Sequence, residues 1–247
     1  MPCPSAFCQW RMSMKKIQAK SDPRIAERLT VCTLFREMTA QDIWSCFNCS
    51  GAELAVYDRG EIIYSENDCP QKMFLLFEGS VLLGRNSSSG RREVIATLSD
   101  TGDILGAEDL FLEEKQYACY AEAVRKTRLI LMPRDFLMHT CVNACSYHAK
   151  LISNMLYVFA LKTKQQDERM EIMSGASMRQ KIAKMLLIRA KNGAEPLTMS
   201  RERMAEYLNV ARPSLSRELI RMKEDGLIEL ENKSIYIADR EALNKLV

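Results

Sequence analysis

The sequence has no hydrophobic run long enough to cross a membrane, since a spanning helix needs about 20 mostly apolar residues in succession. Residues 1–10 also lack the basic start and the apolar stretch of a secretory signal peptide. No other segment directs the chain out of the cell interior. We therefore expect a cytoplasmic protein with no membrane partner.

Histidine is scarce, because the 247 residues contain only His139 and His148. A metalloenzyme built on a barrel of strands needs several clustered histidines, and neither of these two lies in an expected strand. The chain also lacks the Gly-x-Ser-x-Gly turn, a phosphate-binding glycine loop and a His-Glu-x-x-His zinc motif. We therefore expect no enzymatic activity and no cofactor, and keep a cupin-like metalloenzyme as the remote alternative.

Cysteine is plentiful, but its nine residues are an odd number scattered along the chain, which argues against a disulfide framework. Cys141, Cys145 and His148 follow one another at i, i+4 and i+7 and would share one face of a helix. Sulfur and imidazole ligands suit zinc or a haem-type centre. The simpler interpretation is that these are small core or interface residues, and we favour it over a metal site.

The composition fits two domains, because 247 residues with 47% hydrophobic content can bury one or two cores. The net charge is only +3, but it is unevenly distributed. From Met178 onward there are 14 Lys and Arg against 10 Asp and Glu, which leaves 21 against 22 for the rest. The excess positive charge lies at the C-terminal end, as a nucleic-acid contact would require.

The C-terminal third contains the most informative pattern. Ser200 can cap a short helix that ends near Leu208, residues 209–211 predict a tight turn, and Pro213 fits the first turn of a second helix. We expect the second helix to bury Leu215, Leu219, Ile220 and Met222. Its outward side chains are the predicted DNA contacts: Arg212, Ser214, Ser216, Arg217 and Arg221. This is a helix-turn-helix suited to the DNA major groove, rather than two bundle helices with a solvated face.

The residues after the second helix predict a hairpin. Gly226 ends the helix, and residues 228–238 alternate like two short strands around Glu231-Asn232-Lys233. A hairpin directly after a helix-turn-helix makes a winged helix.

The region from about Leu54 to Met132 has a different pattern, with short β-type runs separated by glycine turns. The expected strands are 54–57, 61–64, 73–77, 80–83, 92–98 and 128–132, with an exposed hairpin loop at 86–91. Regularly spaced short strands predict a β jelly roll. Ahead of it, residues 22–49 have a helical pattern, with Thr39 as an N-cap and Asp42 three residues later.

One long helix is expected from 135 to 173, with an apolar stripe that would pack against a second copy of the chain. The predicted dimer-interface residues are Leu151, Met155, Val158 and Leu161. A break at Gly175 would be the hinge to the C-terminal domain. The expected division is therefore an extension without fixed structure (1–29), a sensing jelly roll with flanking helices (30–134), a dimerisation helix (135–173) and a winged helix-turn-helix (174–247).

In this order the elements resemble the CRP/FNR superfamily of bacterial transcription regulators, from about residue 30 to the end. The resemblance is most specific at Met73-Phe-Leu-Leu-Phe-Glu-Gly-Ser-Val81, Gly102-Asp-Ile-Leu-Gly-Ala-Glu-Asp-Leu-Phe111 and Ala211-Arg-Pro-Ser-Leu-Ser-Arg217. It implies an α+β fold with a cyclic-nucleotide-binding-like jelly roll, a homodimer, and an imperfectly palindromic double-stranded DNA site. It also implies a small-molecule effector in the jelly roll, and it adds RNA polymerase as a candidate partner.

The effector pocket implied by the resemblance consists of Leu105, Gly106, Ala107, Glu108, Tyr117, Ala118 and Cys119. Cyclic-AMP-binding members carry a glutamate where this chain has Ala107, and an Arg-Ser pair where it has Tyr117-Ala118. A buried phosphate without a cationic or N–H partner binds poorly, so we expect an effector other than cyclic AMP, or a pocket filled by its own side chains. Arg91 and Arg92 leave an exception open, because the 86–91 hairpin could fold over the pocket and supply a positive charge to a bound phosphate.

Iron–sulfur members of the family use N-terminal cysteines and one cysteine in the jelly roll. Here Cys3 and Cys8 are far from Cys46 and Cys49, and the place of the fourth ligand is the apolar Ile130. We therefore expect a DNA-binding regulator switched by an unidentified effector. A thiol- or metal-based redox sensor of the same fold is the main alternative.

Overall fold

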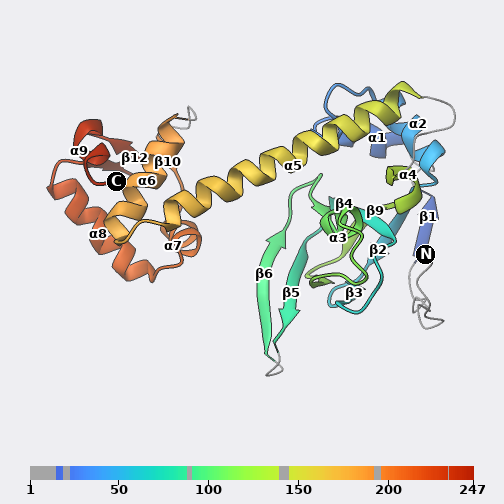
Figure 1. Ribbon diagram of the computed structural model, residues 1–247, viewed down its shortest axis with the longest axis horizontal. Helices are drawn as coiled ribbons and strands as arrows, with labels where there is room; N and C mark the ends of the chain where they lie inside the picture. Colours follow the sequence, from blue (N-terminus) through green and yellow to red (C-terminus); the bar gives the residue numbers. More distant parts are fainter. Residues whose placement is uncertain (1–14, 19–22, 88–90, 139–144, 192–195, 233) are drawn as a thin grey trace. The chain divides into compact units, whose positions relative to one another are not determined.

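The computed structural model describes residues 15–18, 23–87, 91–138, 145–191, 196–232 and 234–247 (Figure 1). The chain forms two compact units, Met1–Val158 and Phe159–Val247, which are described separately. Among the described residues, no helix combines the length and the apolar character needed to span a membrane.

The first unit is built on two antiparallel sheets, which confirms the predicted jelly roll. One sheet has the order β1-β2-β9-β4-β7 and the other the order β3-β8-β5-β6. The strands of the first sheet are β1 (Lys15–Gln18), β2 (Glu53–Tyr57), β9 (Thr127–Pro133), β4 (Lys72–Glu78) and β7 (Ile104–Leu105). Those of the second are β3 (Ile62–Tyr64), β8 (Tyr120–Ala123), β5 (Val81–Asn86) and β6 (Arg92–Leu98).

Strand β4 lies between β9 and β7 and is buried from Met73 to Phe77, which explains its uninterrupted apolar run. Just beyond it, Gly79 has φ +116° and approaches Thr127 so closely that a Cβ would lie 2.5 Å from the Thr127 Oγ1. Only glycine fits there. The six expected strands are present, whereas β7 and β8 were not predicted.

The N-terminal extension was predicted to lack structure, and this is wrong for part of it. Strand β1 pairs with β2, and α1 (Pro23–Leu29) buries Ile25, Ala26 and Leu29. Residues 1–14 lie outside the described part of the chain. The segment 22–49, predicted to be helical, contains α1, η2 (Thr33–Phe35) and α2 (Ala40–Ser50), and α2 begins with the expected capping box between Thr39 and Asp42.

The single helix expected from 135 to 173 is also wrong, because the chain forms α4 (Arg134–Met138) and a separate α5 (Ser146–Met173). The ring of Phe136 in α4 stacks on His148 in α5, with centroids 4.3 Å apart. In one continuous helix, these residues would be separated by about 18 Å of axial rise. The side-chain stack is therefore incompatible with one continuous helix.

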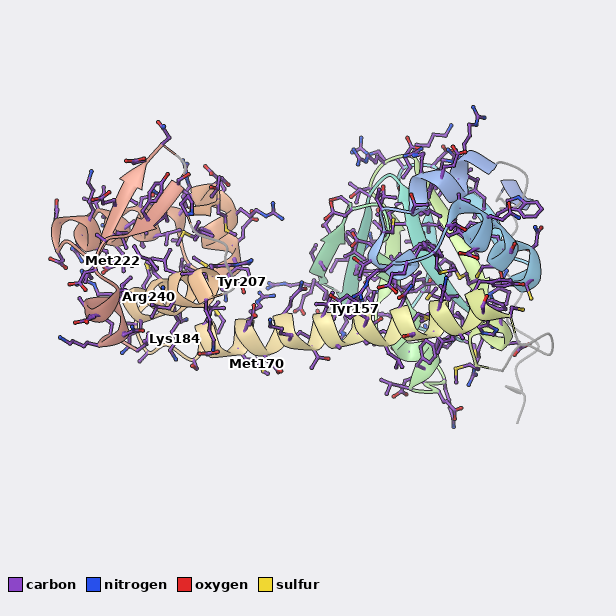
Figure 2. The ribbon with its side chains drawn as sticks, turned by 90° about the horizontal axis from the view of Figure 1, so that it is seen from above. Tyr157, Met170, Lys184, Tyr207, Met222 and Arg240 are labelled. Carbon is purple, nitrogen blue, oxygen red and sulfur yellow. The ribbon has the colours of Figure 1, made fainter. Side chains whose placement is uncertain are left out.

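Helix α5 packs against the segment before α2 in the first unit. Its Asn154 side chain donates to the Arg36 carbonyl at 2.8 Å, and the Lys150 ammonium donates to the Glu37 carbonyl at 3.2 Å. The Arg36 guanidinium lies 4.8 Å from the ring centroid of Tyr157, which Figure 2 labels. These contacts fix which side of α5 faces the jelly-roll unit.

The second unit is the predicted winged helix, with one additional strand. It contains α6 (Met178–Lys191), β10 (Leu197–Thr198), α7 (Arg201–Leu208), α8 (Arg212–Glu224), β11 (Ile228–Glu231), β12 (Ser234–Ile237) and α9 (Arg240–Asn244). The wing is a three-stranded sheet of order β10-β12-β11, because a strand ahead of the helix-turn-helix joins the expected hairpin. Leu215, Leu219 and Met222 of α8 are buried in the core (Met222 is labelled in Figure 2), but Ile220 is 52% exposed, contrary to prediction.

Candidate functional site

The helix-turn-helix forms as its local sequence predicts. The Ser200 hydroxyl accepts a hydrogen bond from the Arg203 N–H and caps α7. Asn209 then takes a left-handed conformation with φ 52°, and the Val210 N–H donates to the Ala205 carbonyl at 3.0 Å. The turn therefore satisfies the end of α7 and starts α8 in a fixed direction.

The outward face of α8 carries the residues predicted to contact DNA. Arg212, Arg217 and Arg221 are exposed, while Ser214 and Ser216 are half-buried beside them. Among the described residues, the contacts of the Arg217 guanidinium are long, 3.4 Å from Nε to the Pro213 carbonyl and 3.5 Å from Nη2 to the Ser214 hydroxyl. A hydrogen bond at that length is weak, so the guanidinium can exchange it for a stronger acceptor.

Arg212 has a stronger contact within the protein. Its Nε lies 2.9 Å from a carboxylate oxygen of Glu202 in α7, and both side chains are more than half exposed. An exposed ion pair of this kind contributes about 0–1 kcal/mol. It orients Arg212 without preventing its release to another partner.

Arg179 connects α6 to α8, and it was not identified from the sequence. From α6 it donates to Glu218 at 2.6 Å through Nε and to Asp225 at 2.6 Å through Nη1. The hydrogen bond to Glu218 is the main reason that the pKa of Arg179 is raised. Arg179 therefore connects the middle and the C-terminal end of α8 to α6.

Arg201, the first residue of α7, was also missed. Its Nη1 atom is buried and has no hydrogen-bond partner among the described residues, and burial lowers the pKa of this guanidinium. A desolvated guanidinium group normally finds an acceptor. The burial of this guanidinium could not be foreseen from the local sequence.

In the jelly roll, the predicted effector-pocket residues divide into two groups. Leu105, Gly106, Ala107 and Tyr117 are buried. Glu108 and Ala118 are exposed, so they do not face a buried site as predicted. Cys119 is half-buried at the edge of the group.

Aromatic rings fill the interior near these residues. Tyr117 is 3% exposed and stacks on Tyr64 with centroids 4.0 Å apart, and Tyr64 in turn lies 5.4 Å from Phe74. The Tyr117 hydroxyl donates to the Lys72 carbonyl at 3.3 Å. Gly106, with φ +68°, approaches the Tyr117 ring so closely that a Cβ would lie 2.9 Å from it.

The charged groups near this cluster make contacts of their own within the first unit. Arg92 lies 3.3 Å from Glu122 and 5.7 Å from the Tyr120 ring centroid, and the Arg85 Nε donates to the Ala118 carbonyl at 3.2 Å. Asp109 is the nearby carboxyl that the sequence did not indicate, and burial raises its pKa. These contacts join Arg92 of β6 to residues of β8 across the intervening strand β5, whereas Arg85 lies next to the predicted pocket residue Ala118.

The candidate metal ligands are not brought together on one helix face. Cys141 lies outside the described residues, and Cys145 precedes α5 instead of lying within it. His148 is 5% exposed against Phe136. Within the described ranges, no group of three His, Cys, Asp or Glu side chains could hold a metal ion.

The predicted dimer-interface residues differ in their exposure to solvent. Leu151 and Met155 are 0% and 2% exposed within a single chain, so their side chains are not on a free surface. Val158 and Leu161 are half-buried. The large exposed apolar side chains of α5 are instead Leu156, Tyr157 and Met170, at 67%, 42% and 65%.

Comparison with known proteins gives two matches that together cover both units. Residues 54–143 match the cyclic nucleotide-binding domain, and residues 180–246 match the Crp-like helix-turn-helix domain. The chain is 28% identical over 204 residues to the nitrogen fixation regulation protein FixK of Rhizobium meliloti, covering 80% of this chain and 89% of that protein. It is 23% identical over 195 residues to the CRP-like cAMP-activated global transcriptional regulator of Mycobacterium tuberculosis, covering 76% and 84%.

A solved structure supports the fold. A CooA mutant from Carboxydothermus hydrogenoformans superposes with a TM-score of 0.52 at 18% identity, covering 85% of this chain and 91% of that one. The order of domains, the geometry of the helix-turn-helix and the family matches agree. This chain belongs to the CRP/FNR superfamily of DNA-binding transcription regulators.

Proposed function

We propose that this protein is a homodimeric, non-enzymatic regulator that reads an imperfect DNA palindrome with α8. The observation that carries the proposal is the exposed face of α8, where Arg212 and Arg217 project from a helix held by Arg179. Arginine forms bidentate hydrogen bonds with O6 and N7 of guanine in the major groove. Two such helices in a dimer would meet half-sites about one DNA turn apart.

The other polar residues then have supporting roles. Ser214 would contact a phosphate, Ser216 a base or a phosphate, and Arg221 the DNA backbone.

The dimer seam that we propose is shifted by one residue from the sequence-based prediction. Positions 152, 156, 159, 163, 166 and 170 of α5 alternate in steps of four and three, as in a coiled coil. This set includes Leu156 and Met170, whereas Leu151 and Met155 pack inside the same chain. Val158 and Leu161, two and five residues after Leu156, fall on other sides of the helix.

The jelly roll has a different role in this proposal. The stacked rings of Tyr64, Tyr117 and Phe74 occupy the interior that a ligand would need, which favours a pocket filled by its own side chains. Some relatives, such as the cyclic AMP receptor protein of Thermus thermophilus, are named for that nucleotide. In this chain, Tyr117 and Ala118 offer no cation to a buried phosphate. Saturable micromolar binding of cyclic AMP in titration calorimetry would contradict this part.

The function is tested by selecting bound sequences from a random DNA pool with the purified, effector-free protein. We expect an imperfect palindrome with guanines in each half-site and a complex that contains two protein chains. Leu156→Glu with Met170→Glu should give monomers and lose the palindrome, while Gln165→Glu, on the opposite side of α5, should not. Selection of no common sequence would reject the proposal.

A further inference from the structure

Two apolar side chains are exposed on α8, and the proposed role of its arginines does not explain them. Ile220 is 52% exposed in the middle of the helix, and Pro213 is exposed in its first turn. The other exposed residues of α8 are all charged. A single exposed apolar residue is ordinary on a protein surface, but the positions of these two are related.

Pro213, Arg217 and Ile220 lie on one stripe of α8. At 3.6 residues per turn, side chains four and seven residues after Pro213 point within about 40° and about 20° of the same direction. The 3.4 Å contact from the Arg217 Nε to the Pro213 carbonyl agrees with this arrangement. The buried residues of α8 lie on the opposite side of the helix. Arg217 therefore has an exposed apolar neighbour on each side along the stripe.

The major groove of DNA offers a matching apolar group. It is the C5 methyl group of thymine, which apolar side chains contact directly. Pro213 and Ile220 are separated by about 10 Å of axial rise, which corresponds to about three base-pair steps. One turn beyond Ile220, the stripe ends at the exposed carboxylate of Glu224, which phosphates would repel. The apolar contact would thus extend from Pro213 to Ile220.

We propose that Pro213 and Ile220 read thymine methyl groups on the two sides of the guanine contacted by Arg217. This rests on the proposed function, because it requires α8 to lie in the major groove. Each half-site then has a T·A pair on either side of that guanine, with the thymine in either strand. The apolar pair adds sequence preference without a phosphate contact, so its contribution does not depend on salt.

The test replaces thymine by deoxyuridine, which lacks only the C5 methyl group, in the palindrome selected by the full-length protein. We expect the affinity, measured by fluorescence anisotropy, to fall about two- to fourfold for each of the proposed methyl groups removed. Replacement of thymines elsewhere in the same DNA should have no effect. Because the change is made in the DNA, the folding of the protein is not altered.

Protein variants assign each methyl group to a side chain. Ile220→Ala should make binding insensitive to deoxyuridine on one side of the guanine, and Pro213→Gly should do so on the other side. Neither variant should change the salt dependence of binding. Val247→Ala shortens another exposed apolar side chain of the second unit and should retain both responses. Circular dichroism verifies that each variant is folded.

Equal affinity for the thymine and deoxyuridine palindromes would overturn the proposal. A deoxyuridine response that persists on both sides in Ile220→Ala, or in Pro213→Gly, would overturn the role of that residue. In both cases the protein still binds a palindrome, so the proposed function stands. Selection of no common sequence would instead refute the proposed function, and this proposal with it.

Discussion

The outward face of α8 and the interior of the jelly roll use polar side chains in opposite ways. On α8, Arg212 and Arg217 are exposed and loosely held. In the jelly roll, Tyr64 and Tyr117 are 2% and 3% exposed and stack on each other. The comparison shows that one region leaves its hydrogen-bonding groups exposed to solvent, whereas the other buries its aromatic groups in the core.

The largest expected effect is on the stability of the jelly roll. Tyr117→Ala should lower the free energy of unfolding by about 3–4 kcal/mol, because it removes a buried ring and leaves a cavity beside Tyr64 and Gly106. Chemical denaturation followed by circular dichroism measures the loss. In this variant alone, p-cresol should restore part of the thermal stability by filling the cavity.

Two controls make that prediction specific. Tyr117→Phe keeps the ring and removes only the 3.3 Å hydrogen bond to the Lys72 carbonyl, so it should cost about 1 kcal/mol. Tyr157→Ala removes a ring that is 42% exposed. A loss in Tyr117→Ala no greater than in Tyr157→Ala would show that the interior is not filled by Tyr117.

An alanine substitution on the outward face of α8 should affect DNA binding and leave the free energy of unfolding unchanged. Arg217→Ala should weaken specific binding by about 1–3 kcal/mol and relax the preference at one base pair in each half-site. Fluorescence anisotropy on the selected palindrome and on single-base variants measures both effects. Arg240→Ala in α9 (Arg240 is labelled in Figure 2) removes the same charge from another exposed position and is the control. Unchanged affinity and base preference in Arg217→Ala would be incompatible with the proposed readout.

Arg179 links stability to recognition and should have an intermediate effect. Arg179→Met removes the hydrogen bonds to Glu218 and Asp225 and should destabilise the second unit by about 1–2 kcal/mol, since Arg179 is only 29% exposed. Specific DNA binding should fall even under conditions where the variant remains folded. Calorimetric unfolding and anisotropy measure the two losses, and Arg179→Lys should recover part of each. A loss of stability without any loss of affinity would mean that Arg179 does not position α8.

The smallest expected effect concerns the ion pair that Arg212 already has. Glu202→Gln removes a carboxylate 2.9 Å from Arg212 and should strengthen DNA binding by about 0.5 kcal/mol. Arg212 then no longer has to break an ion pair before it contacts DNA, and one negative charge is lost from the protein surface. Anisotropy at several salt concentrations measures the change, with the exposed Glu229 of β11 replaced by Gln as a control. Weaker binding in Glu202→Gln would show that Glu202 positions Arg212 and does not compete for it.

The helix-turn-helix could be predicted in detail because its signals are local. Ser200, Asn209 and Pro213 each act within one turn of the backbone, and the helical period then determines which residues of α8 face outward. The same reasoning misplaced Ile220, because the width of the buried face depends on what packs against it. Arg179 and Arg201 were missed for a related reason, since their partners or surroundings come from other elements.

The jelly roll could be predicted as a class, but its smallest elements could not. Apart from Tyr120, the residues of strand β8 (Ala121, Glu122 and Ala123) have little intrinsic strand preference, and the strand forms because β3 and β5 pair with it on both sides. Strand β7 has only two residues. Pairing between distant segments leaves no periodic signal in such short stretches.

By itself, the sequence determined the order of the elements, the two kinds of domain and the outward residues of α8, since each follows from capping, turns or a repeat of a few residues. Only the tertiary structure decided where α4 ends and α5 begins, that Leu151 and Met155 pack within the chain, and that Tyr117 fills the jelly roll. These features depend on contacts between residues far apart in the chain, and the free energy of such contacts is not encoded in any local pattern.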